Sequence, residues 1–139
     1  MLDDLRSRGL RITPQRVAIV RLFADDPSHP TAQELFERLR PKFPAMSFAT
    51  VYNTLDALAG AGLSRTLRLG TAARFDPNTQ PHHHAVCDRC GAIVDVPAKD
   101  QDADPPAKRT VRAAAPGFAV TRVEHIYRGL CARCAAADS

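Results

Sequence analysis

Apolar residues recur at helical spacing in two early segments of the chain, and each segment opens with a capping residue. The first segment begins with Thr13 before Pro14, an N-cap followed by the residue that favours the first helical position. The second begins with the capping box Thr31–Glu34 and stops at Pro41. Their apolar positions are Ile19, Val20 and Phe23 in the first segment and Leu35, Phe36 and Leu39 in the second. The pattern predicts two short helices.

A third helix is predicted to begin after Ser47, with Met46 and Val51 placed to pack together across its first turn. Its apolar side would bury Phe48, Val51, Leu55 and Leu58. The opposite side is small and polar, with Ala49, Thr50, Asn53 and Ala57, and Tyr52 on the flank. Such a surface can enter a DNA major groove, because Asn and Thr reach base edges there. An ordinary amphipathic helix with a solvated outer face is the alternative.

Two short strands are predicted after this helix, over 64–69 and 72–76, with Gly70 in the turn between them. Arg65, Arg68 and Arg74 would lie on this hairpin, where they could contact phosphates or a minor groove. Three short helices followed by a hairpin indicate a winged helix-turn-helix domain.

The excess of basic charge lies entirely in the first half of the chain. Residues 1–75 carry 11 Lys and Arg against 7 Asp and Glu, whereas residues 76–139 carry 8 of each, so the net charge of +4 belongs to the first half. We predict two domains, 1–75 and 76–139, of which the first meets a polyanion and the second controls it. A basic surface that is merely solvated would have the same charge.

All four cysteines lie in two Cys-x-x-Cys pairs, Cys87 with Cys90 and Cys131 with Cys134. Four thiolates close a tetrahedron around zinc and leave no position for a substrate, as in structural zinc sites. The same spacing could also supply disulfides or a thiol redox switch. No apolar stretch resembles a signal peptide or a membrane span. We therefore expect a cytoplasmic protein with reduced thiols, which favours zinc.

Three consecutive histidines precede the first cysteine pair. On a strand, His82 and His84 would project from the same side while His83 points away. Asp76 and Asp95 stand at the ends of the neighbouring predicted strands. Nitrogen and oxygen ligands of this kind suit iron, manganese or a second zinc. A polar patch or an adventitious metal cluster is the alternative.

Four motifs follow one another along nearly the whole chain, from about residue 8 to Cys134. They are Arg11-Ile12-Thr13-Pro14-Gln15-Arg16, His29-Pro30-Thr31-Ala32, Ser47-Phe48-Ala49-Thr50-Val51-Tyr52-Asn53-Thr54-Leu55 and His82-His83-His84-Ala85-Val86-Cys87-Asp88-Arg89-Cys90-Gly91. In this order they resemble the ferric uptake regulator family. The resemblance implies an α+β protein, in which an N-terminal winged helix-turn-helix domain binds double-stranded operator DNA. A C-terminal α/β dimerisation domain would hold the four-cysteine zinc site.

The resemblance also implies a homodimeric, metal-dependent transcriptional repressor with no catalytic residues, no small organic cofactor and no membrane partner. The ligands of its regulatory metal, Fe(II) or Mn(II), would be His29, Asp76, His82, His84 and Asp95. We expect His83 and His125 to be surface or secondary residues. Glu124 and His125 could also contribute to a further metal site. We expect DNA contacts from Arg16, Ala49, Thr50, Tyr52, Asn53, Arg65 and Arg68.

The two carboxylates favour the peroxide-sensing branch of that family, whose members carry Asp where iron-level sensors tend to carry Glu. Asp76 and Asp95 are both Asp. The branch implies that bound Fe(II) reduces hydrogen peroxide, and that the oxidant attacks His29 or His82 and thereby releases DNA. Mn(II) would support DNA binding and react poorly with peroxide. A repressor that responds to iron, manganese or zinc levels through the same ligands is the alternative.

The C-terminal half gives weaker patterns. A helix fits from about Pro105 to Ala115 with Asp104 as its cap, although prolines interrupt its start. Residues Phe118–Leu130 alternate enough to form a strand that leads to Cys131.

Two other classes of function fit parts of the pattern. A zinc deaminase would place Glu two residues after its ligand histidine, but His82 is followed at that distance by His84. A protein-binding adaptor whose fold is held together by a structural zinc would explain the cysteines. It would not explain why the basic charge lies in the winged-helix half.

Overall fold

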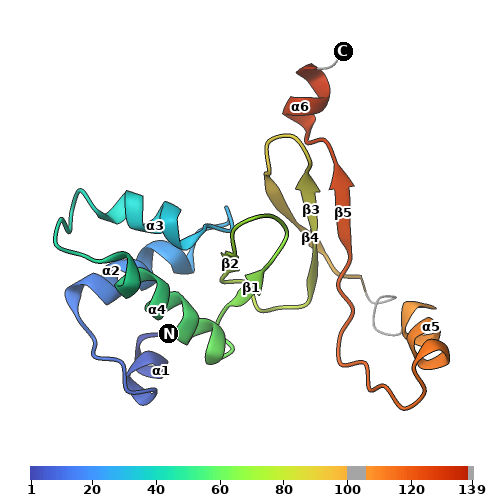
Figure 1. Cartoon of the computed structure of the whole chain (residues 1–139), viewed down its shortest axis with the longest axis horizontal. Coiled ribbons are helices and arrows are strands. Elements are labelled where there is room, and N and C mark those ends of the chain that lie inside the picture. Colours follow the sequence, from blue (N-terminus) through green and yellow to red (C-terminus); the bar gives the residue numbers. More distant parts are fainter. Residues whose placement is uncertain (100–105, 138–139) are drawn as a thin grey trace. The chain divides into compact units, whose positions relative to one another are not determined.

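The computed structural model describes residues 1–99 and 106–137 and divides the chain into two compact units, Met1–Thr79 and Gln80–Ser139 (Figure 1). The sequence analysis placed the boundary after residue 75. The difference has a local cause, because Asp76 pairs with Arg65 in a hairpin of the first unit. The Asn78 N–H then donates to Asp76 Oδ1 at 2.9 Å, which keeps the next residues with that hairpin. In the described ranges, no helix combines the length and apolar content needed to cross a membrane.

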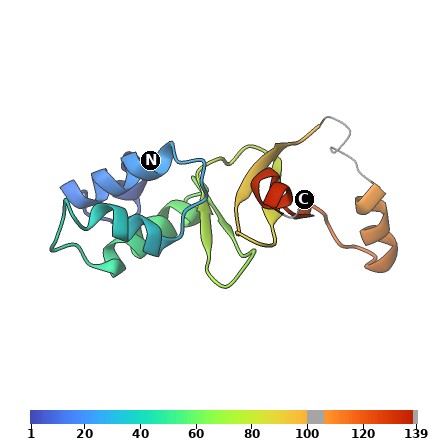
Figure 2. The same cartoon turned by 90° about the horizontal axis from the view of Figure 1, so that it is seen from above.

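Residues 1–79, all of them described, contain four helices that gather into one cluster, coloured from blue to green in Figures 1 and 2. The three predicted N-caps are confirmed. Thr13 and Ser47 each accept a backbone N–H three residues later, and Thr31 forms both bonds of its capping box with Glu34. The helices are α1 (Leu2–Ser7), α2 (Pro14–Ala24), α3 (Ala32–Leu39) and α4 (Phe48–Gly60).

Helix α1 was not predicted, because six residues are too few to establish a periodic pattern and only Leu5 in it is buried. The core of the first unit lies between the helices, where Val51, Leu55 and Leu58 of α4 are fully buried. The prediction that Phe48 joins this stripe is wrong. Its side chain is 42 % exposed and meets the Phe36 ring edge-on, with the ring centroids 6.0 Å apart.

The predicted hairpin is present but shorter than expected. Strands β1 (Arg65–Leu67) and β2 (Arg74–Asp76) pair antiparallel. The hairpin is attached to the loop before α3, because the Phe75 N–H donates to the Pro30 carbonyl at 2.9 Å. Arg74 was expected to lie on the hairpin in a position suited to contacts with phosphates or a minor groove. It instead turns to this loop, where its guanidinium donates to the His29 carbonyl at 3.1 Å.

The second unit is built on a three-stranded sheet of order β4-β3-β5 (Figure 1). Strands β3 (His82–Cys87) and β4 (Ile93–Pro97) form an antiparallel pair, and β5 (Ile126–Gly129) runs parallel to β3. Helix α6 (Ala132–Ala137) follows β5 directly, and α5 (Pro106–Ala114) precedes the segment that leads into β5.

Two expectations for this unit are corrected. The strand predicted over 118–130 exists only at Ile126–Gly129, where the parallel pairing with His84–Cys87 of β3 supplies its hydrogen-bond partners. Asp95 does not end its strand, because β4 continues to Pro97. Helix α5 lies close to the predicted range, but Asp104, its expected cap, and Pro105 lie outside the described residues.

Candidate metal centres

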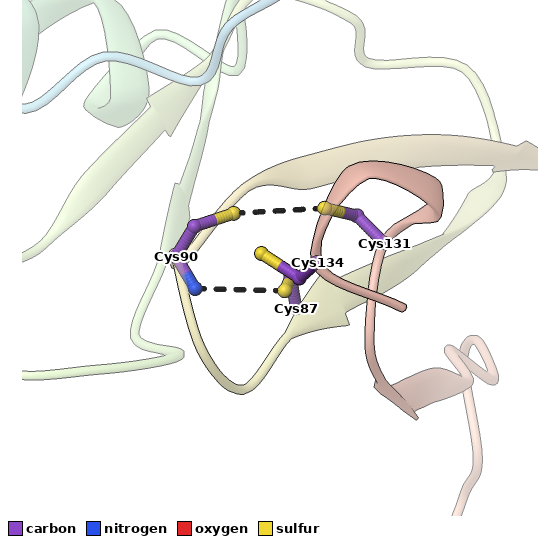
Figure 3. Close-up of side chains that lie close together, drawn as sticks. All are labelled: Cys87, Cys90, Cys131 and Cys134. Atoms are coloured by element: carbon purple, nitrogen blue, oxygen red, sulfur yellow. Dashed lines mark hydrogen bonds between the residues drawn. The ribbon is translucent and has the colours of Figure 1, made fainter. Parts of the chain in front are cut away.

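The four cysteine sulfur atoms gather at one end of the sheet of the second unit (Figure 3). Cys87 ends β3 and Cys90 lies in the turn before β4, whereas Cys131 and Cys134 stand at the start of α6. All four are free thiols, and their sulfur atoms lie within 4.8 Å of one another. Sulfur ligands at about 2.3 Å from a tetrahedral zinc are separated by roughly 3.8 Å. The Cys90 and Cys131 sulfurs are 3.8 Å apart, so the cluster fits zinc.

Backbone hydrogen bonds explain why these distant residues meet. The Cys87 N–H donates to Ala92 and the Gly91 N–H to Cys87, both at 2.9 Å, which closes the first turn. Gly91 has a φ of 75°, a conformation that glycine adopts without strain. The Asp88 N–H donates across to Gly129 at 2.7 Å, which joins this turn to the end of β5 just before the second pair.

Backbone N–H groups and a neighbouring thiol shift the pKa values of three of these cysteines. The backbone N–H of Cys131 is the main cause that lowers the pKa of Cys87 to about 6. The pKa of Cys131 is also lowered, chiefly by the backbone N–H of Cys134. In contrast, the neighbouring Cys131 sulfur raises the pKa of Cys134 to about 12. Negative charge is therefore unevenly shared among the four sulfurs, and a divalent cation would allow all of them to ionise.

His29 and Asp76 lie side by side in the first unit. His29 Nε2 is 3.5 Å from Asp76 Oδ2, and both side chains are buried. The Arg74 and Phe75 bonds to the loop before α3 bring His29 to the end of β2. Asp76 is held in turn by the Asn78 N–H.

The backbone of His29 has a positive φ of 55°, in the left-handed region that non-glycine residues rarely occupy. This conformation costs about 1 kcal/mol or more. It persists here because the His29 and Pro30 carbonyls both accept hydrogen bonds from β2. Strain maintained by surrounding bonds is common at functional positions.

Three further predicted ligands converge in the second unit. Alternation along β3 puts His82 and His84 on one face, as predicted, and Asp95 pairs with His84 across the sheet. His82 Nε2 lies 3.0 Å from His84 Nε2 and 3.1 Å from Asp95 Oδ1, and His84 Nε2 lies 3.4 Å from the same oxygen. Ligand atoms about 2.1 Å from one ion are separated by roughly 3.0–3.4 Å. The three atoms therefore have the spacing of ligands to a single ion.

The ring orientation of His82 is set by a backbone contact. His82 Nδ1 lies 2.6 Å from the Gln80 carbonyl oxygen, which can only accept, so Nδ1 is the donor. In the neutral ring this leaves a lone pair on Nε2, the nitrogen that faces His84 and Asp95. His84 has a different neighbour at the equivalent nitrogen, because its Nδ1 lies 2.9 Å from Glu124 Oε1.

His83 was expected to be a surface or secondary residue, and it is not at the surface, because only 3 % of its area is exposed. It points away from the converging ligands, as predicted, and stacks on the His125 ring at a centroid distance of 4.5 Å. The His125 backbone N–H also donates to His83 Nδ1 at 2.9 Å. These contacts pack His83 against His125, just before β5, which the sequence did not indicate.

The expected DNA-contacting residues are divided between α4, α2 and the hairpin. On α4, Ala49, Tyr52 and Asn53 are exposed, and Thr50 is half-buried. Ala57, expected on the same face, packs partly against the core. Two of the remaining predicted contacts form hydrogen bonds within the chain: Arg16 donates to the Arg11 carbonyl at 2.6 Å, and Arg65 donates to the Thr79 carbonyl at 2.9 Å. The third, Arg68, is exposed.

Comparisons with known proteins agree with the sequence resemblance. The model of the ferric uptake regulator family matches residues 7–134. A peroxide operon regulator of Bacillus subtilis is 40% identical over 136 residues, which cover 96% of this chain and 90% of the relative. A peroxide-responsive repressor, PerR, of Staphylococcus epidermidis is 47% identical over 95 residues. That match covers 68% of this chain but spans only 63% of the relative's length.

A solved structure gives the same assignment. PerR from Streptococcus pyogenes, described in terms of peroxide sensing and gene regulation, is 32% identical and aligns with a TM-score of 0.51. The alignment covers 96% of this chain and 89% of that protein. The order of winged-helix and sheet elements and the four-cysteine cluster agree with this relationship. The chain belongs to the ferric uptake regulator family.

Proposed function

We propose that this chain is a metal-dependent transcriptional repressor that senses hydrogen peroxide through iron-catalysed oxidation of a histidine ligand. The observation that carries the proposal is the convergence of His82 Nε2, His84 Nε2 and Asp95 Oδ1 at metal-ligand spacing. Relatives that align with most of this chain carry the names peroxide operon regulator and peroxide-responsive repressor. Together these observations favour a repressor over an enzyme.

The regulatory metal would take His29 and Asp76 from the first unit and His82, His84 and Asp95 from the second. Three imidazole nitrogens and two carboxylate oxygens form a donor set suited to Fe(II) or Mn(II). A ligand set divided in this way would make metal binding depend on how the two units are held together. DNA binding by the first unit would then depend on the metal.

Peroxide sensing requires a ligand that changes when it is oxidised. Bound Fe(II) would activate hydrogen peroxide so that one of its oxygen atoms is inserted into a histidine ring and the other leaves as water, and Mn(II) would do so poorly. His29 and His82 are the residues that we expect to gain one oxygen atom. Oxidation of either ring would weaken it as a nitrogen donor, lower the metal affinity and release the DNA.

The DNA would be contacted by the exposed face of α4, with Ala49, Thr50, Tyr52 and Asn53 in the major groove. Arg16, Arg65 and Arg68 would add contacts to the phosphates. The net charge of residues 1–75 is consistent with a polyanionic partner.

The second unit would form the homodimer and hold the structural zinc on its four cysteines. Large apolar side chains remain exposed on and beside its sheet, a property typical of interaction surfaces. They are Val94, Ile126, Tyr127 and Leu130, with exposed fractions between 43 % and 58 %.

The test uses zinc-loaded full-length protein and a DNA fragment selected by the protein from a random pool. The protein is loaded anaerobically with Fe(II) or with Mn(II), DNA binding is confirmed, and low-micromolar hydrogen peroxide is added. DNA release is followed by fluorescence anisotropy, and the peptides that contain His29 and His82 are analysed by mass spectrometry.

The proposal predicts DNA release together with one added oxygen on a histidine in the iron form, and neither change in the manganese form. Retained DNA and unmodified histidines in both forms would instead identify a repressor that responds to the level of metal. If neither Fe(II) nor Mn(II) promoted DNA binding, the proposal of a metal-dependent repressor would be wrong.

A further inference from the structure

The segment before β5 brings one acidic side chain against a histidine of the converging set. Strand β5 pairs in parallel with β3 in the register His84↔Ile126, and the His84 N–H donates to the His125 carbonyl at 3.1 Å. These contacts hold the chain beside His84. Glu124 Oε1 consequently lies 2.9 Å from His84 Nδ1, the ring nitrogen that does not face His82 and Asp95.

The geometry of this contact favours one placement of the His84 proton. The His84 side chain is fully buried and that of Glu124 is 24 % exposed. An ionised carboxylate can only accept, so the contact is favourable when the imidazole proton is on Nδ1. The N···O distance is that of a charge-assisted hydrogen bond, although the ring orientation in the structure does not align the N–H with Oε1. The neutral ring then has its lone pair on Nε2.

His82 provides an internal comparison. Its Nδ1 donates to the Gln80 carbonyl, which likewise leaves a lone pair on Nε2. Both rings therefore present Nε2 toward Asp95. Glu124 differs from the Gln80 carbonyl because it carries a full negative charge, which would make the His84 nitrogen the stronger donor of the two.

We propose that Glu124 is a positioning residue for the regulatory metal. The Glu124 carboxylate keeps the His84 proton on Nδ1 and thereby directs Nε2 to the ion. This inference rests on the proposed function, because it takes His84 to be a ligand. Loss of a group that orients a metal-binding histidine typically lowers metal affinity by about 10–100-fold. Glu124→Ala is expected to weaken Mn(II) binding by roughly that factor.

The first measurement is an anaerobic Mn(II) titration of the zinc-loaded full-length protein, with free Mn(II) followed by electron paramagnetic resonance. Glu124→Gln should weaken binding less than Glu124→Ala, because the amide oxygen can still accept the N–H although the charge is lost. Thr121→Ala changes an exposed position on the same segment and should bind Mn(II) like the unchanged protein. Equal affinities for Glu124→Ala and the unchanged protein would overturn the inference.

A second measurement does not depend on whether the variants fold. Nitrogen-15 NMR of the unchanged protein, with Zn(II) filling the regulatory site, identifies which ring nitrogen of His84 binds metal. The inference predicts a protonated Nδ1 and a metal-bound Nε2. Metal on Nδ1 would overturn it. If the unchanged protein lacked a metal site besides the cysteine cluster, the proposed function would fail, and this inference with it.

Discussion

The two metal centres that we propose for this chain would differ in how their ligands are distributed. The four cysteines all belong to the second unit, where β3, β4, β5 and α6 bring them together through backbone hydrogen bonds. The histidines and aspartates are divided, with His29 and Asp76 in the first unit and His82, His84 and Asp95 in the second. A centre contained in one unit can stabilise that unit. A centre with divided ligands can report on the arrangement of two units.

This distinction predicts a difference in the response to ligand loss. Removal of a cysteine would leave the remaining thiols without the zinc that we propose holds them, so the fold of the second unit should fail. Removal of a histidine leaves both folds intact and should abolish only the coupling between metal and DNA.

The largest effect is expected from Cys134→Ser. Structural zinc contributes on the order of 10 kcal/mol to folding in small zinc domains, so loss of one thiolate should unfold the second unit or abolish the dimer. Zinc content, circular dichroism and light scattering would detect the change. A folded, zinc-loaded dimer in this variant would show that the four-cysteine centre is not structural.

His82→Ala should leave a folded, zinc-loaded dimer whose DNA binding no longer responds to Mn(II). We expect its affinity for Mn(II) to fall by roughly 100-fold, because a direct ligand is lost and not only its orienting partner. The matched control is His125→Ala, since His125 stacks on the opposite face of β3, against His83. If His82→Ala unfolded the protein as Cys134→Ser does, the separation of the two centres would be wrong.

A smaller effect is expected from Arg74→Gln. The Arg74 guanidinium donates to the His29 carbonyl and lies 3.5 Å from Glu34 Oε1, so it connects the loop that carries His29 to the start of α3. Loss of this link should destabilise the first unit by about 1–2 kcal/mol and also weaken Mn(II) binding. Arg68→Gln on the same hairpin, at an exposed position, should change neither property. Chemical denaturation and the Mn(II) titration provide both readouts.

The smallest effect is expected from Thr31→Ala, which removes one bond of the capping box at the start of α3. A lost N-cap costs about 1 kcal/mol of stability. Because Thr31 follows His29 by two residues, this variant tests whether a loss of stability near that loop is by itself enough to lower the Mn(II) affinity. Unchanged Mn(II) affinity alongside the lower stability would show that the Arg74 effect is specific.

Local features of the sequence predicted the parts of the structure that local physics determines. Thr13, Thr31 and Ser47 cap helices because their side chains satisfy backbone N–H groups within the same turn. The alternation of a strand was enough to place His82 and His84 together and His83 opposite.

Features that depend on pairing between distant segments could not be predicted in this way. Only residues 126–129 of the expected strand find a partner in β3, and that register is what places Glu124 beside His84. The inward turn of Arg74 depends likewise on the loop that carries His29, which lies 45 positions earlier in the chain. Phe48 has helical spacing with the core residues, but it lies at the first position of α4, where its neighbours cover it incompletely.

The most direct test of the divided metal centre is the Mn(II) affinity of the zinc-loaded protein measured with and without bound DNA. Coupling between two binding sites is reciprocal, so DNA should tighten Mn(II) binding by the same factor by which Mn(II) tightens DNA binding. The account predicts this equality, and its loss in His29→Ala, with the zinc retained. An Mn(II) affinity that is identical with and without DNA would contradict the account.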